Sequence, residues 1–171
     1  MIAYAIIMTK IIEVYMGYSK EEIDSYNYDK DYFQPIVEVY LLSNNHYKKY
    51  FAAIGLNLTP QQWHALNRLW MKDGMSQAEL AKKIFRDYPF TTRLVDVLEK
   101  KGFVVRSSNT GDRRVKNIFL TKNGKEFKYQ AYPLFLNKAK SLRAGLSDSE
   151  LLELKRICGK IRQNYIEAEK Y

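Results

Sequence analysis

Two groups of cationic and hydroxyl-bearing residues are the parts of this sequence best suited to chemistry with a polyanion. The first, Pro89-Phe90-Thr91-Thr92-Arg93, combines two small hydroxyls with an arginine. The second is a polar stretch that contains Asp112, Arg113, Arg114 and Lys116. Hydroxyl and guanidinium groups donate hydrogen bonds to phosphate oxygens and to base edges. Both groups are therefore candidates for contact with a nucleic acid.

The first group begins a helix whose size fits a DNA groove. We predict this helix from Pro89 to Lys101, ended by Gly102, and a helix of that length spans about 20 Å. A B-DNA major groove is about 12 Å wide and admits one helix, whose N-terminal residues approach the bases. The predicted contacts are the residues at that end: Phe90, Thr91, Thr92 and Arg93. The opposite face is apolar and should be buried: Leu94, Val97 and Leu98, with Phe103 beyond.

The second group belongs to a predicted β-hairpin. Residues 103–106 and 115–120 are rich in β-branched and aromatic residues and are expected to be strands, whereas 107–114 is polar and turn-forming. Arg113, Arg114 and Lys116 suit a hairpin tip that lies along a minor groove, where negative potential attracts guanidinium groups. Asp112 would repel phosphate, so we expect it to brace Arg114 or the loop.

Each candidate also has a purely structural interpretation. Arg93 could pair with Asp96 or Asp87 on the surface, and Phe90 could pack beneath the turn as easily as touch a thymine methyl. The charged hairpin could serve solubility alone.

Sequence signals for the starts and ends of helices divide the rest of the chain into segments. Four capping boxes each place a hydroxyl three residues before a Glu or Gln: Ser19 to Glu22, Thr59 to Gln62, Ser76 to Glu79 and Ser147 to Glu150. We predict helices at 35–53, 60–72, 77–84, 89–101, 121–142 and 147–169. The pair 77–84 and 89–101, joined by a tight connection, indicates a helix-turn-helix followed by a hairpin wing. The expected fold class is mainly α with a small β-hairpin wing.

Composition limits the classes of protein. With 171 residues and 46% hydrophobic content the chain can bury a sizeable core, and its single cysteine excludes an internal disulfide framework. The apolar run at the N-terminus is too short for a membrane span and lacks a basic leader, so we expect a helix that packs on the body or on a partner subunit, in a cytoplasmic protein. The net charge of +9 is concentrated away from residues 1–30, and 76–121 contains ten Lys or Arg against five Asp or Glu.

Several segments in this order resemble the multiple-antibiotic-resistance regulator (MarR) family. They are Leu58-Thr59-Pro60-Gln61-Gln62-Trp63, Ser76-Gln77-Ala78-Glu79-Leu80-Ala81, Thr92 to Gly102, Asp112-Arg113-Arg114 and Leu120-Thr121, within about residues 33–168. The resemblance implies a homodimer with intertwined terminal helices that reads a pseudo-palindrome on double-stranded DNA, and a small phenolic ligand or oxidation that loosens binding. It implies that Arg93 contacts the major groove and Arg114 the minor groove, with Asp112 bracing the wing. Ser76 and Gln77 complete the expected DNA-contacting set.

These observations predict a transcriptional regulator, most simply a repressor. Its expected parts are an N-terminal extension (1–30), a winged helix-turn-helix domain (58–121) and a helical dimerisation region (31–57 and 122–171). The turn Phe85-Arg86-Asp87-Tyr88-Pro89 lacks the family's usual small residues, and about 30 N-terminal residues are extra. The alternative is a winged helix used for protein–protein contact or assembly. An enzyme is not expected, because no catalytic motif is visible.

The remaining candidate residues are those that could sense a chemical signal such as a ligand, an oxidant or a metal ion. Four aromatic residues could line a cavity for a small aromatic ligand, or could simply be core: Tyr40, Tyr47, Trp63 and Trp70. Cys158 is expected to be a buried packing residue among Leu154, Ile157 and Ile161, with an intersubunit thiol pair as the alternative. His46 and His64 lie on different predicted helices, so neither a metal site nor any other cofactor is expected.

Overall fold

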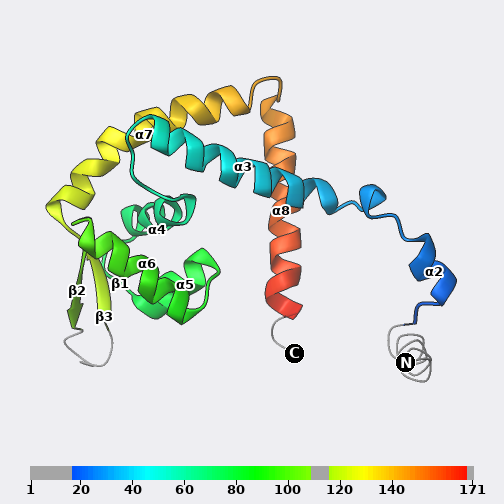
Figure 1. The fold of residues 1–171 in the computed structure, drawn as a ribbon, viewed down its shortest axis with the longest axis horizontal. Coiled ribbons are helices and arrows are strands. Elements are labelled where there is room, and N and C mark those ends of the chain that lie inside the picture. Colours follow the sequence, from blue (N-terminus) through cyan, green and yellow to red (C-terminus); the bar gives the residue numbers. More distant parts are fainter. Residues whose placement is uncertain (1–16, 109–115, 169–171) are drawn as a thin grey trace. The chain divides into compact units, whose positions relative to one another are not determined.

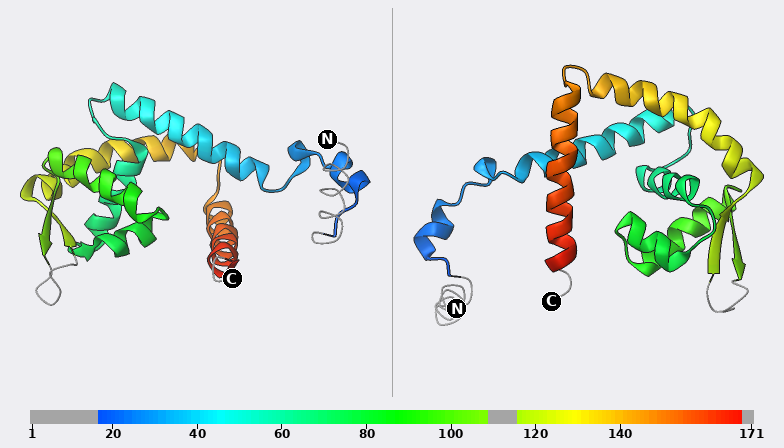
Figure 2. Two further views of the ribbon diagram at one scale, coloured as in Figure 1. Left: turned by 60° about the horizontal axis from the view of Figure 1, so that its bottom comes forward. Right: turned by 180° about the vertical axis from the view of Figure 1, so that it is seen from behind.

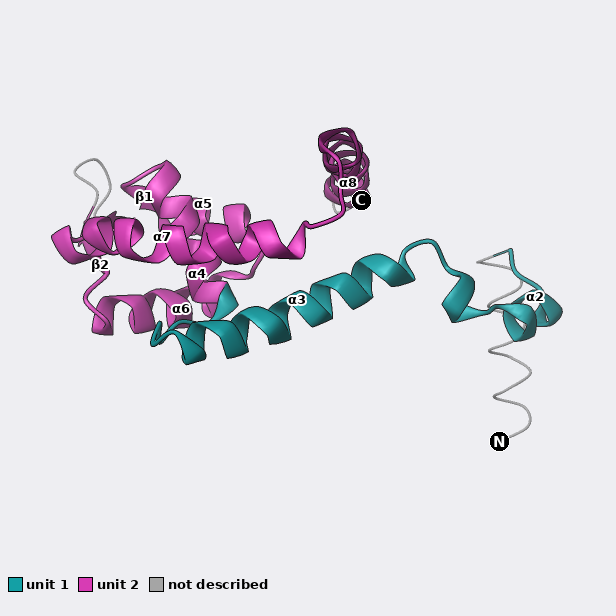
Figure 3. Ribbon diagram, turned by 90° about the horizontal axis from the view of Figure 1, so that it is seen from above, with its two compact units in different colours: residues 1–60 teal, residues 61–171 magenta. Residues whose placement is uncertain are grey.

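The computed structural model describes residues 17–108 and 116–168 (Figure 1). The helix expected within residues 1–16 and most of the expected wing tip lie outside this part of the chain. The described residues fall into two compact units, divided between Pro60 and Gln61 (Figure 3). Each unit is described by itself.

The first unit is built from helices with little buried surface. Helix α2 (Lys20–Ser25) begins at the predicted capping box, where Glu22 N–H donates to Ser19 Oγ at 3.1 Å and Ser19 N–H donates to Glu22 Oε2 at 2.7 Å. These hydrogen bonds to Ser19 hold the pKa of Glu22 below its usual value. A 3₁₀ turn, η1 (Tyr28–Lys30), and the long α3 (Gln34–Ala53) follow.

The second unit contains the remaining elements in the predicted order. They are α4 (Pro60–Met71, which begins at the unit boundary), β1 (Met75–Ser76), α5 (Gln77–Ile84), α6 (Tyr88–Lys100), β2 (Val104–Ser108), β3 (Lys116–Leu120), α7 (Lys122–Leu142) and α8 (Asp148–Ala168). Three helices followed by a two-stranded hairpin are the arrangement of a winged helix-turn-helix. The predicted fold class is confirmed.

The hairpin belongs to a small antiparallel sheet with the order β1-β3-β2. Val104 pairs with Leu120 and Ser108 with Lys116, while Met75 of β1 pairs with Ile118. The sequence did not predict β1, which is only two residues long. Asp73 reinforces this edge, because its Oδ1 accepts a hydrogen bond of 2.8 Å from the backbone N–H of Leu120.

The core of this unit lies where α4, α5 and α6 meet the sheet (Figures 1 and 2). Its fully buried side chains include Leu66, Leu69, Leu80, Leu98 and Ile118. These residues come from each of the three helices and from the central strand, so the core fixes α6 against both α5 and the wing.

Helix α6 buries a different apolar stripe from the one expected. Thr91, Leu94, Val95 and Leu98 are buried, whereas Val97 is 37% exposed. The buried positions follow the i, i+3, i+4, i+7 spacing of one helix face, which includes Val95 and excludes Val97. The expected burial of Val97 was therefore wrong.

Helix α8 buries none of its residues. Leu154 and Ile157 are more than 40% exposed, and the thiol-bearing Cys158 is exposed as well. The expectation that Cys158 is a buried packing residue was therefore wrong for this chain. The reason is that the apolar side of α8 has no covering element among the described residues.

Candidate nucleic-acid interface

The start of α6 is fixed by its N-cap. The carboxylate of Asp87 accepts a hydrogen bond of 2.6 Å from the backbone N–H of Phe90, one of the donors left unpaired at a helix start. The turn before this helix begins at Phe85, which ends α5 with its backbone in the left-handed region at φ 54°. The turn therefore delivers a 13-residue helix whose N-terminal end is open to solvent at Tyr88.

Arg93 lies on the exposed face of α6. The two carboxylates that could have paired with it have other partners, because Asp87 caps the helix and Asp96 forms an ion pair of 2.7 Å with Arg106. Within the described part of the chain Arg93 forms no ion pair, so its guanidinium is available for an external acceptor.

Phe90 is half-buried beside the turn. The guanidinium carbon of Arg86 lies 5.3 Å from the centroid of its ring, which is cation–π geometry. Part of this ring is therefore covered by the protein itself, and the remainder faces solvent.

Two of the expected contact residues turn out to be internal. Thr91 is fully buried, and its hydroxyl donates to the carbonyl oxygen of Asp87 at 2.8 Å. Gln77 is only 4% exposed. This placement corrects the expectation for both: their side chains hold α6 in place and do not face a duplex. Ser76 is half-buried and uses its hydroxyl as the N-cap of α5, accepting from Glu79 N–H at 3.1 Å.

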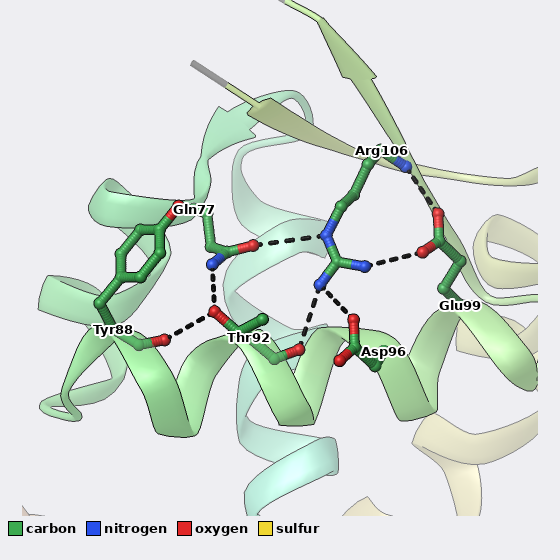
Figure 4. A network of polar contacts seen from close by, with 6 residues as sticks. All are labelled: Gln77, Tyr88, Thr92, Asp96, Glu99 and Arg106. Atoms are coloured by element: carbon green, nitrogen blue, oxygen red, sulfur yellow. Dashed lines mark hydrogen bonds and ion pairs between the residues drawn. The ribbon is translucent and has the colours of Figure 1, made fainter. Parts of the chain in front are cut away.

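A network centred on Arg106 joins α5, α6 and the wing (Figure 4). The guanidinium of this β2 residue forms ion pairs of 2.7 Å with both Asp96 and Glu99 of α6. It also donates to Gln77 Oε1 at 3.3 Å and to the carbonyl oxygen of Thr92 at 3.1 Å. The backbone N–H of Arg106 donates to Glu99 Oε1 at 3.0 Å.

The same network fixes the hydroxyl of Thr92. It accepts from Gln77 Nε2 at 2.6 Å and donates to the carbonyl oxygen of Tyr88 at 3.0 Å (Figure 4). Directional hydrogen bonds thereby join α5, α6 and β2 and hold these elements at one relative orientation.

Sequence reasoning missed Arg106 as a site residue. A signal was present, since an arginine interrupts an apolar strand segment and Asp96 and Glu99 lie one helical turn apart on α6. Only the fold shows that these groups meet.

The wing is described up to the ends of its strands. Lys116 is exposed, and its Nζ donates to Ser108 Oγ across the hairpin at 2.8 Å. Asp112, Arg113 and Arg114 lie outside the described residues, so their expected roles remain predictions.

The expected ligand-binding aromatics lie in both units. Trp63 and Trp70 pack with rings of α7: the Trp63 centroid is 4.9 Å from Phe135 and the Trp70 centroid is 5.5 Å from Tyr132. Trp70 Nε1 also donates to the carbonyl oxygen of Gly124 at 2.9 Å. Tyr40 and Tyr47 belong to α3 in the first unit. A shared cavity for the four residues stays a prediction.

The histidines are half-buried on α3 and α4, as expected. Burial lowers the pKa of His64, and the nearby charges of Arg68 and Arg86 lower it further. No group of three or more His, Cys, Asp or Glu among the described residues could hold a metal ion. Among these residues no helix has both the length and the apolar character to cross a membrane.

Comparison with known proteins agrees with this geometry. Residues 58–116 match the model of the MarR family. A MarR transcriptional regulator from Methanosarcina mazei Go1 is 22% identical, with a TM-score of 0.69, over 79% of this chain and 96% of that one. S. aureus MepR, solved as a DNA complex, is 24% identical, with a TM-score of 0.71, over 79% and 98%.

A probable transcriptional regulator from Pseudomonas aeruginosa is 26% identical, with a TM-score of 0.65, over 79% of this chain and 99% of that chain. The family match covers the three helices of the helix-turn-helix and the first strand of the wing, which are the elements that hold Arg93 and Arg106. Residues 58–116 therefore form a winged helix-turn-helix domain that matches the MarR family.

Proposed function

We propose that this chain is a cytoplasmic, sequence-specific repressor that binds a pseudo-palindromic operator as a homodimer. The observation that carries the proposal is the division of roles among its arginines. Arg106 is internal and locks α6 to the wing, whereas Arg93 projects from the exposed face of α6 without an ion-pair partner in the described chain. The role is one of binding and requires no catalytic group.

Arg93 is the proposed reader of base edges in the major groove, with Thr92 and Phe90 beside it. A guanidinium group can donate two hydrogen bonds to a guanine, which discriminates bases by about 1–3 kcal/mol. Such discrimination requires a fixed helix, and the Arg106 network supplies that rigidity. The structure of MepR with DNA supports a duplex as the partner of this fold.

The wing is the proposed minor-groove contact. Lys116 is exposed at the end of β3, and Arg113 and Arg114 precede it in the sequence. We assign Arg114 to the minor groove and Asp112 to bracing the loop, following the order of residues in the family motif.

Dimerisation is proposed from exposed apolar surface. On α8, Leu152 and Tyr165 are each 67% exposed, and on α3, Val39 and Leu42 are similarly open. Soluble proteins rarely expose such extended apolar helix faces to water, so we propose that a second copy of the chain buries them in a dimer interface. Residues 31–57 and 122–171 form the proposed dimerisation region and residues 58–121 the DNA-binding domain. Residues 1–30 are a proposed extension that packs on the body of the protein or on the partner subunit.

A small aromatic effector remains part of the proposal. Tyr40, Tyr47, Trp63 and Trp70 are its proposed neighbours, and tryptophan fluorescence should change when aromatic carboxylates are added. A flat titration across a broad panel would remove this part of the proposal and leave the rest intact.

The decisive experiment selects duplexes from random DNA with the purified protein and then measures affinity by fluorescence anisotropy. Half-sites should lie about one helical turn apart. Log affinity should fall with log salt concentration by about 0.9 per phosphate neutralised. Absence of duplex binding at low ionic strength would refute the proposal and favour a winged helix that contacts proteins.

Variants separate the two kinds of contact. Arg93→Ala should weaken binding and relax sequence preference at one position of each half-site, whereas Arg114→Ala should weaken it on all sequences. Lys160→Ala, which removes an exposed charge from α8, is the matched control and should change affinity little.

A further inference from the structure

The residues of α6 fall into three stripes along the helix, and one of these is exposed from end to end. The buried stripe consists of Thr91, Leu94, Val95 and Leu98. A second stripe faces the wing, where each member contacts the guanidinium of Arg106 (Figure 4): Thr92, Asp96 and Glu99. The exposed stripe, called the outer stripe below, consists of Pro89, Arg93, Val97 and Lys100. Its spacing of three or four residues places these side chains on one face.

The outer stripe has a cation on each side of Val97. Arg93 lies one turn before Val97 and Lys100 lies one turn after it. Across residues 17–108 and 116–168 neither cation forms an ion pair. Unpaired cations on a helix surface attract the phosphates that border a DNA groove. A duplex that approaches α6 therefore meets Val97 between two groups that favour its presence.

Val97 itself has no group that forms a hydrogen bond with its side chain. Its exposed fraction is 37%, and a single exposed valine on an ordinary surface needs no explanation. This valine, however, occupies the middle of the stripe that carries Arg93. In a major groove the base edges offer one apolar group, the C5-methyl of thymine. A valine at this place therefore has a defined apolar partner.

We propose that Val97 contacts a thymine methyl beside the guanine that Arg93 reads. This inference rests on the proposed DNA-binding function and adds a second base to the operator. Residues four positions apart on a helix are separated by about 6 Å along its axis. Successive base pairs are separated by about 3.4 Å. The thymine therefore lies about two base pairs from the guanine in each half-site.

The test compares thymine with deoxyuridine, which lacks only the C5-methyl group. It uses the full chain and the duplex recovered by selection, in which Arg93→Ala first identifies the position of the guanine. Each thymine within about three base pairs of that guanine is then replaced in turn, on both strands. One replacement per half-site should weaken binding about fourfold in fluorescence anisotropy, because one buried methyl group returns to water. Equal affinity for every replaced duplex would overturn the inference.

Val97→Ala then assigns the methyl contact to this residue. The variant should bind the thymine and deoxyuridine duplexes equally at that position and should keep its preference for the guanine. Val105→Ala is the matched control, because it makes the same change at a valine of β2 that is 46% exposed. The control should keep the full fourfold discrimination. If Val97→Ala keeps it as well, the methyl is read by another side chain, such as that of Phe90, and the assignment is overturned.

A folding measurement accompanies the binding assay. Because Val97 lies on the outer stripe and alanine is the better helix former, Val97→Ala should leave the urea midpoint unchanged or slightly raised. A clearly lowered midpoint would show that Val97 packs within the protein, and it would count against a contact with DNA.

The outcomes distinguish this inference from the proposed function. Duplex binding that depends on the thymine methyl and on Val97 supports both. Duplex binding without any such dependence refutes the role of Val97 and leaves the repressor proposal intact. Absence of duplex binding at low ionic strength refutes the repressor proposal and the inference together.

Discussion

Replacing Arg106 by methionine should destabilise the protein far more than a surface arginine would. The side chain of Arg106 is 19% exposed, and its two carboxylate partners, Asp96 and Glu99, are 47% and 38% exposed. Methionine keeps the apolar stem of the side chain and removes the guanidinium. The change therefore measures the polar network and not a cavity.

The magnitude follows from what each partner loses. Asp96 and Glu99 regain water when the guanidinium is gone, so each ion pair contributes only about 0.5–1 kcal/mol. Gln77 is 4% exposed and loses a hydrogen bond that water cannot easily replace, and the carbonyl of Thr92 loses another; together these cost about 1–2 kcal/mol. The expected loss of unfolding free energy is roughly 2–4 kcal/mol.

Urea unfolding at fixed protein concentration measures this loss, because the apparent stability of the proposed dimer would depend on concentration. Arg106→Lys should recover about half of it, since one ammonium can pair with only one carboxylate at a time. Arg93→Met is the matched control on the exposed face and should shift stability by less than about 0.5 kcal/mol. If Arg106→Met and Arg93→Met unfold at the same urea concentration, the network does not fix α6 and the reasoning fails.

Three further predictions test the domain. Gly124→Ala should cost about 2–3 kcal/mol by urea unfolding, because an added Cβ would lie 2.0 Å from the carbonyl oxygen of Phe103 and a backbone atom cannot move aside cheaply; a neutral result would show that α7 shifts freely. Asp73→Asn should lower the unfolding temperature, because it weakens the ion pair to Lys125 at 3.2 Å and the hydrogen bond to the N–H of Leu120; an unchanged temperature would mean that the sheet edge needs no anchor. His64 has a lowered pKa in the folded state, so the unfolded chain binds the proton more tightly and stability should fall as pH drops from about 6.5 toward the folded-state pKa. His64→Gln should remove that pH dependence of the urea midpoint, and persistence of the slope would assign it to another group.

Local signals in the sequence predicted most of the elements of the winged domain. The helix 77–84 has the predicted bounds, because Ser76 caps its start and its apolar spacing is regular. Helix α6 begins one residue before the predicted Pro89, because Asp87 is the N-cap and places Tyr88 first and Pro89 second. A proline fits either position of a first turn, so the sequence could not distinguish them.

The predictions that were missed or wrong depend on contacts between residues that are far apart in the sequence. β1 forms because β3 offers it a free edge, and two residues carry no pattern of their own. Thr91 carries a small hydroxyl of the kind that contacts DNA. It lies, however, on the same helix face as Leu94, Val95 and Leu98, which the fold buries. Cys158 lies in an apolar pattern that predicts burial, yet nothing in the described chain covers that side of α8.

The arginines of this domain show why a site residue must be identified from the fold. Arg93 lies three residues before Asp96 and Arg106 lies seven residues after Glu99, and a count of charges along the sequence gives the two arginines the same weight. In the structure Asp87 is committed to the N-cap, and Asp96 and Glu99 to Arg106. No carboxylate of α6 is therefore left for Arg93. Asp96 and Glu99 bind Arg106, so they hold α6 against the wing and do not pair with Arg93. Replacing Asp96 or Glu99 by a neutral residue should therefore loosen α6, while Arg93 still has no carboxylate partner.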